Sequence, residues 1–200
     1  MGYKLEFLEK AAKLEKSEKW QEMLTFCKGW AAEEPQNLSA WQGIGDSLRK
    51  LGKPEEAIPM YRKGLDVSLS YRADTGGIFS AGPLWYRLGH AFSDLGDHHK
   101  AIEAFLEAAK IDPDVADIWN DLGVVYINMT PREVQAAYDA FSKAISVDPK
   151  NTNSLKNLGV VYAMCGSEKG VNQIHQMLSN IGKNEANDFL RQAKGILASH

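Results

Sequence analysis

The stretch WYRLGHAF at residues 85–92 places Trp85, Leu88, Gly89 and Phe92 at helical offsets of three, four and seven. Because an α-helix has about 3.6 residues per turn, these four positions share one face. Gly89 therefore lies inside an apolar stripe, although glycine within a helix normally lowers stability. The missing side chain lets another helix come close, so the stretch predicts a helix that packs through its glycine.

The same spacing of apolar residues and glycine recurs along the chain. Four copies begin with Trp41, Trp85, Trp119 and Leu155, and a weaker copy begins with Phe7. The first residues of successive copies are 34, 44, 34 and 36 positions apart, so the base period is 34. A fixed period of this length predicts a repeat array, in which stacked units share one core.

Each copy continues into a second amphipathic segment. In the copy that opens at residue 85, this segment carries Ala101, Phe105 and Ala108 on one face and stops at Pro113, because proline cannot continue a helix. The repeating unit is therefore a helix hairpin, and we expect Gly89 to approach Ala101 closely. The turns after the first helices are marked by Gly52, Gly96 and Gly166.

Tryptophan or leucine, a Leu-Gly pair and an aromatic residue, followed by Ala, Phe, Ala and Pro within 34 residues, resemble the tetratricopeptide repeat. The resemblance covers nearly the whole chain. It implies an all-α fold, a right-handed α-α superhelix (solenoid) of about five helix hairpins with a C-terminal capping helix. We expect a single domain over 1–200. Its repeats are expected at about 4–37, 38–71, 82–115, 116–151 and 152–184, with the capping helix at 185–198.

An insertion at residues 66–83 interrupts the period. Gly76 and Gly77 break the helix there, and the apolar residues Ile78 and Phe79 fall in an expected loop. Two interpretations remain open. The loop folds over the groove or recognises a partner, or a longer second helix is followed by a surface insertion whose Phe79 packs on a neighbouring hairpin.

The resemblance implies that the first helix of each hairpin lines the concave side of the superhelix. Residues beside the Leu-Gly pair point away from the core. Amide groups there can bond a peptide backbone, while Tyr86 and Arg87 can select side chains. We predict that this face binds a partner, with a solvated helix face as the alternative for any single residue. The predicted binding residues are Gln42, Asp46, Tyr86, Arg87, His90, Asp117, Asn120, Asp121, Asn128, Lys156 and Asn157.

Charge limits the choice of partner. The net charge of -3 argues against nucleic acid, which usually binds a basic surface. Residues 83–149 hold five basic and eleven acidic side chains, and Asp117 and Asp121 fall on the predicted face. We therefore expect a neutral or basic segment of a protein partner. One branch of the family clamps acidic chaperone tails with a Lys/Asn/Arg set; that set is absent here, and we predict no such clamp.

The sequence offers no catalytic or metal-binding set. No nucleophile, base and orienting group can be assembled from local spacing, and the histidines lack acids or cysteines at metal spacing. We predict a non-catalytic scaffold for protein–protein interaction, without cofactor or metal. The alternative function is self-assembly into homo-oligomers through the ends of the array or the 66–83 loop.

The sequence also favours a cytoplasmic location. Cys27 and Cys165 form no CxxC pattern, which favours a reducing compartment. The first twenty residues lack the apolar core of a signal peptide, and no run approaches eighteen apolar residues. No membrane partner is expected.

Overall fold

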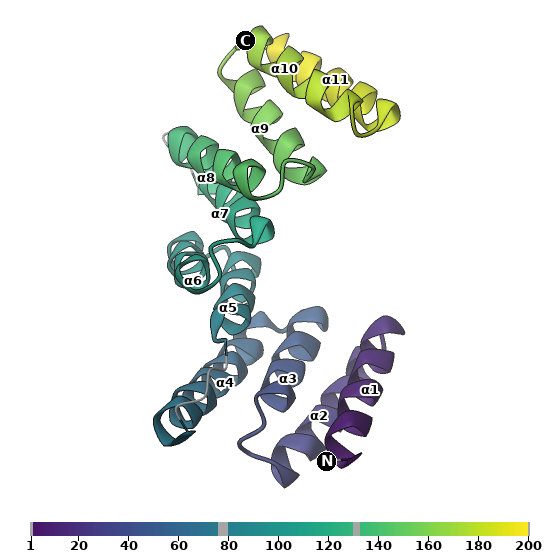
Figure 1. Cartoon of the computed structure of the whole chain (residues 1–200), viewed down its shortest axis with the longest axis vertical. Helices are drawn as coiled ribbons and strands as arrows, with labels where there is room; N and C mark the ends of the chain where they lie inside the picture. Colours follow the sequence, from purple (N-terminus) through teal and green to yellow (C-terminus); the bar gives the residue numbers. More distant parts are fainter. Residues whose placement is uncertain (1, 76–79, 130–132, 200) are drawn as a thin grey trace. The chain divides into compact units, whose positions relative to one another are not determined.

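The computed structural model describes residues 2–75, 80–129 and 133–199, with side chains for residues 6–70, 80–129 and 133–199. These ranges contain eleven α-helices and no strand (Figure 1). The all-α class expected from the sequence is confirmed. The chain divides into two compact units, Met1–Ile111 and Asp112–His200, here called unit 1 and unit 2. The expectation of a single domain stays a prediction.

Unit 1 is a stack of three helix hairpins. Its helices are α1 (Gly2–Lys16), α2 (Trp20–Glu33), α3 (Leu38–Lys50), α4 (Pro54–Thr75), α5 (Gly82–Asp94) and α6 (His98–Ile111). The two helices of each hairpin pack on each other, as Figure 1 shows for α3 with α4 and α5 with α6. Neighbouring hairpins stack because α2 also packs on α3, and α4 on α5.

Unit 2 contains two hairpins and a final helix. Its helices are α7 (Ala116–Met129), α8 (Val134–Val147), α9 (Thr152–Met164), α10 (Glu168–Ser179) and α11 (Lys183–Leu197). Helix α8 packs on α9, and α11 packs on both helices of the last hairpin (Figure 1). Helix α11 therefore covers the last repeat as a capping helix does.

The repeated glycine of the first helix lies against an aromatic ring. A Cβ atom added to Gly89 would lie 2.5 Å from Cδ1 and Cε1 of Phe105, and all of its nearest neighbours belong to that ring. Phe105 thus replaces Ala101, the partner expected from the sequence, as the group that needs the space. The same arrangement recurs as Gly45 with Tyr61 and Gly123 with Phe141.

The last repeat obtains its ring from outside the hairpin. Its second helix, α10, carries His175 at the position held by Phe105 and Phe141 in the preceding repeats. The space over Gly159 is filled instead by Phe189 of α11, which is 2% exposed. Helix α11 is therefore an integral part of the core of unit 2.

The turns follow the expected pattern. Gly52, Gly96 and Gly166 have φ angles of 75°, 72° and 70°, in the left-handed region that glycine occupies without steric cost. Helix α4 has 22 residues and runs to Thr75, as the interpretation of a longer second helix requires. The rest of the insertion includes residues 76–79, with Ile78 and Phe79, which lie outside the described residues.

Candidate functional site

Five of the predicted binding residues lie in unit 1, on two neighbouring first helices. Helix α3 contributes Gln42 and Asp46, and helix α5 contributes Tyr86, Arg87 and His90. All five are partly exposed. We call this set the α3–α5 face.

Asp46 connects three helices. Its Oδ1 accepts a hydrogen bond from Tyr61 Oη of α4 at 2.7 Å. Arg87 Nε of α5 donates to both carboxylate oxygens, at 2.9 and 2.8 Å. The Arg87 and Asp46 side chains are only 27% and 21% exposed, and charge-assisted bonds in such a setting are stronger than neutral ones. This ion pair therefore links the second and third hairpins.

Two neighbours complete the network around the ion pair. The Gln42 amide lies against the guanidinium, and with its oxygen turned towards Arg87 it accepts a hydrogen bond from Nη2 at 2.7 Å. Burial, and then the negative charge of Asp46, raise the pKa of Tyr61 above its ordinary value. Tyr61 is therefore a neutral hydroxyl donor throughout the physiological pH range. Three of the five predicted residues thus stabilise the stacking of the hairpins.

A cavity of about 170 Å³ opens beside this network. It is lined by Glu15, Trp20, Asp46, Arg49, Lys50, Tyr86, Arg87 and His90. The rings of Tyr86 and His90 meet edge to face, with centroids 4.5 Å apart, and both lie against Phe105. Lys50 Nζ lies 5.8 Å from the centre of the Trp20 ring. The cavity thus combines aromatic surface with charged groups.

The charges around the cavity nearly balance. Its lining carries three cationic side chains and two anionic ones. Arg87 is paired with Asp46, and Arg49 Nη1 donates to Asp94 at 3.1 Å. Burial is the largest single effect on the pKa of Arg49 and lowers it, but the bond to Asp94 and the negative charges of Asp94 and Asp46 together outweigh burial, so the pKa is raised. The sequence led us to expect an acidic binding face, but the lining of this cavity is not acidic.

The other six predicted residues lie in unit 2, on α7 and α9, where most belong to a network between repeats. Asn120 is 8% exposed. Its Oδ1 accepts from Asn157 Nδ2 at 3.0 Å and from Ser154 Oγ at 3.3 Å, and its Nδ2 donates to Asp121 at 3.1 Å. The Asn120 amide is therefore engaged in hydrogen bonds between α7 and α9.

The remaining predicted residues of unit 2 differ in their surroundings. Asp117 is exposed and accepts a hydrogen bond from Asn151 Nδ2 at 3.2 Å. Lys156 Nζ lies 4.0 Å from a carboxylate oxygen of Glu185 on α11. Asn128 is exposed near the end of α7. Unit 2 thus brings Asp117, Asn120, Asp121 and Asn157 together but leaves Asn128 apart.

Sequence reasoning missed four residues of the unit 1 cavity. Glu15 and Trp20 belong to the first repeat, whose weak match to the pattern hides its register. Arg49 lies next to Lys50, and its bond to Asp94 joins residues 45 positions apart, which spacing alone does not reveal. Lys50 occupies the same position in its repeat as the predicted residue Asn128, so a comparison of equivalent positions between repeats contained the signal for it.

Two further properties concern the part of the chain that the structure describes. In that part, no three histidine, cysteine, aspartate or glutamate side chains gather as metal ligands. None of its helices combines the length and the apolar character needed to cross a bilayer.

Comparisons with known proteins agree with the hairpin architecture. A family model described as TPR repeat matches residues 89–129, and one described as tetratricopeptide repeat matches residues 38–71. None of the curated proteins compared with the chain matches it.

Solved structures give the same result for the fold. A crystal structure of MamA is 20% identical, with 94% of this chain and 95% of that chain covered and a TM-score of 0.66. YrrB, described as a TPR protein with an unusual peptide-binding site, is 18% identical, with 94% and 90% covered and a TM-score of 0.68. PilF of Pseudomonas aeruginosa is 13% identical, with 96% and 86% covered and a TM-score of 0.72. At these identities the similarity shows the shared fold.

Proposed function

Since the chain contains tetratricopeptide repeats, we propose that it is a non-catalytic protein-interaction module that binds a peptide segment of a partner at the α3–α5 face. The observation that carries this proposal is the cavity beside the Asp46–Arg87 ion pair. Its aromatic and arginine side chains are the residue types that contribute most binding energy at protein interfaces. A module of this kind acts as a scaffold that holds a partner in place.

The size of the cavity favours a single anchoring side chain. Its volume of about 170 Å³ is below the roughly 300–1,000 Å³ of pockets that enclose whole small molecules. One partner side chain inserted against Tyr86 and His90 would displace water from ring surface, while the rest of the segment lies across the helices.

The paired charges favour an uncharged anchor. Both arginines already have carboxylate partners, so an acidic side chain would have to compete with Asp46 or Asp94 for them, and a basic one with the arginines for the carboxylates. A neutral apolar or aromatic side chain avoids this competition and can pack on the rings. We therefore propose a neutral partner segment, because the nearly balanced charges of the cavity lining favour neither an acidic nor a basic one.

The fold comparison supports a peptide as the ligand. YrrB, which shares the fold, is described as having an unusual peptide-binding site. The location proposed for this chain rests on its own cavity and not on the site of that protein.

The test is a peptide selection followed by a measurement of affinity. Peptides selected from a random display library on the wild-type chain are titrated by calorimetry against Tyr86→Ala and His90→Ala. Each substitution removes ring surface from the cavity, so we expect each to weaken binding about tenfold or more. His99→Ala is the matched control, because His99 is exposed on α6 and does not line the cavity. Thermal unfolding of each variant checks that the fold is kept.

The affinities of the two cavity variants are compared with the affinity of the His99→Ala control. Wild-type affinity in both cavity variants, or equal losses in all three proteins, would show that the peptide binds elsewhere.

A further inference from the structure

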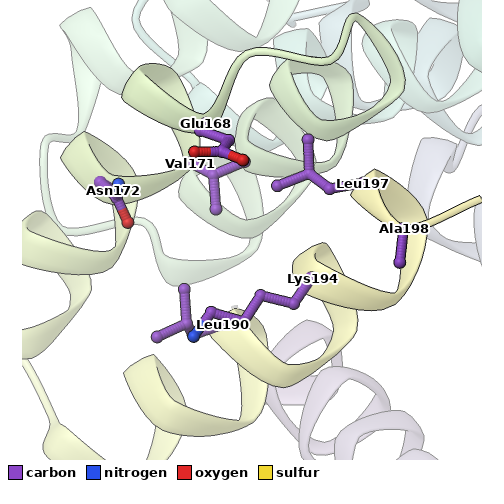
Figure 2. Close-up of a pocket in the computed structure, with 7 residues that line it drawn as sticks. All are labelled: Glu168, Val171, Asn172, Leu190, Lys194, Leu197 and Ala198. Atoms are coloured by element: carbon purple, nitrogen blue, oxygen red, sulfur yellow. The ribbon is translucent and has the colours of Figure 1, made fainter. Parts of the chain in front are cut away.

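A second and larger cavity lies at the C-terminal end of unit 2, between α10 and α11 (Figure 2). Its volume is about 500 Å³. It is lined by Glu168, Val171 and Asn172 from α10 and by Leu190, Lys194, Leu197 and Ala198 from α11 and its end. None of these residues belongs to the α3–α5 face.

The middle of this cavity is apolar and continuous with the core. Val171 is 2% exposed and belongs to the buried cluster of unit 2 together with Phe189. Leu190 and Leu197 pack against that cluster but are only partly buried. The core of unit 2 therefore extends to the surface here, and covering the two leucines would remove further apolar area from water.

Opposite charges flank the apolar middle, one from each helix. Glu168 lies in the first turn of α10, and Lys194 in the last turn of α11. Both are exposed, and among the described residues neither forms an ion pair. Figure 2 shows the two charged ends apart, on different sides of the cavity. The surface thus presents an acid, an apolar centre and a base in sequence.

We propose that this surface, defined as the α10–α11 end, binds the same surface of a second copy of the chain. A two-fold axis makes every contact occur twice, because residue i of one copy meets residue j of the other and j meets i. When such an axis lies in the contact plane, through the apolar centre and at right angles to the line from Glu168 to Lys194, it places Lys194 of each copy opposite Glu168 of the other. The leucines of the two copies then meet around the axis.

The pattern of charge selects a second copy over other partners. A surface with charge of a single sign would attract one of the two flanking groups and repel the other. The identical surface satisfies both groups at once. Stable complexes bury roughly 1,200–2,000 Å², with about 20–30 residues on each side. Since only seven residues line this cavity, the contact falls below that range. We therefore expect a reversible dimer whose fraction rises with concentration.

Sedimentation equilibrium of the full chain over a wide concentration range tests the proposal. We expect the average mass of the wild type to rise from that of one chain towards that of two. Glu168→Lys and Lys194→Glu each place like charges opposite one another, so each variant alone is expected to remain a monomer at concentrations where the wild type dimerises. An equimolar mixture of the two variants restores both opposite-charge contacts and should dimerise again.

The controls separate this contact from a change in folding. Asp188→Lys also reverses a charge on α11, but Asp188 is exposed beside Arg191 and does not line the cavity; its dimerisation should match the wild type. Helical circular dichroism of every variant checks the fold. A wild type that stays monomeric throughout, or a mixture no more dimeric than its separate components, would overturn the proposal. Neither result depends on peptide binding at the α3–α5 face.

Discussion

At the residue scale, two helical glycines of unit 1 have opposite surroundings. A Cβ on Gly89 would meet the Phe105 ring, whereas Gly29 of α2 has nothing within 4 Å of that position. Gly89→Ala should lower the free energy of unfolding by about 1–3 kcal/mol, because the ring must move in a packed core. Gly29→Ala should raise it by up to about 1 kcal/mol, because alanine restricts the unfolded chain and favours helix. Urea denaturation followed by circular dichroism measures both. Equal shifts in one direction would contradict the packing role of Gly89.

The two cysteines provide a second test at this scale. Cys27 is fully buried, and burial together with the negative charge of Asp46 raises its pKa to about 11. Since the thiolate is the reactive form, at about pH 8 a chromogenic disulfide reagent should titrate only the exposed Cys165. The second thiol should appear when the chain is unfolded.

At the pH of this assay, ionisation of Cys27 does not lower the stability of the fold. A thiol whose pKa is raised in the folded state binds its proton more tightly there, so its contribution to stability is complete below the ordinary value of 9.0. That contribution is lost as the pH rises from about 9 to about 11. Rapid reaction of two thiols in the native chain would show that Cys27 is accessible.

At the element scale, α11 is tested through one side chain. Phe189→Ala removes the ring that fills the space over Gly159, and we expect a loss of about 3–5 kcal/mol in the stability of unit 2. Asp188→Ala, at an exposed neighbouring position, should change stability by less than about 0.5 kcal/mol. Hydrogen exchange of the α9 and α10 amides, which Phe189 protects through the core, measures the difference. Unchanged exchange in Phe189→Ala would show that α11 is dispensable to the core.

The helices were predictable from the sequence because their signals are local. The period of about 34, glycines at three of the turns between paired helices (Gly52, Gly96 and Gly166) and proline after second helices, such as Pro113, define the hairpins without knowledge of distant contacts. The partner of Gly89 was not predictable, because Ala101 and Phe105 lie on the same helical face and only the packing angle chooses between them. For the same reason the sequence did not reveal that Phe189 supplies the phenyl ring over Gly159, where the last hairpin has only His175 at the equivalent position.

The candidate site was predictable in part. The position of a residue beside the Leu-Gly or Ile-Gly pair of its repeat identified Asp46, Tyr86, Arg87 and His90, all of which line the unit 1 cavity. These positions did not reveal that Asp46 and Arg87 bind each other, or that Asn120 is buried between repeats. A position within the repeat shows on which side of its helix a residue lies, but not which residue of the next helix it contacts. Trp20 was missed because the first repeat departs from the pattern.

At the scale of the whole molecule, each compact unit contains its own stacked hairpins. Unit 1 has three hairpins, about the number that a repeat array needs for independent stability. A fragment comprising residues 1–111 should therefore show a helical circular dichroism spectrum and unfold cooperatively in urea. An unfolded fragment, or one that loses its helix gradually, would show that unit 1 depends on the rest of the chain.

The ring over Gly159 bears on how an array of this kind changes length during evolution. In the interior repeats the ring belongs to the same hairpin as its glycine, so a duplicated hairpin contains both residues of the contact. In the last repeat the two halves of the contact are 30 positions apart and lie on either side of α10. An extra hairpin inserted between α10 and α11 would separate them. Repeats can therefore be gained or lost among the interior hairpins, while residues 159–189 have to be inherited as one block.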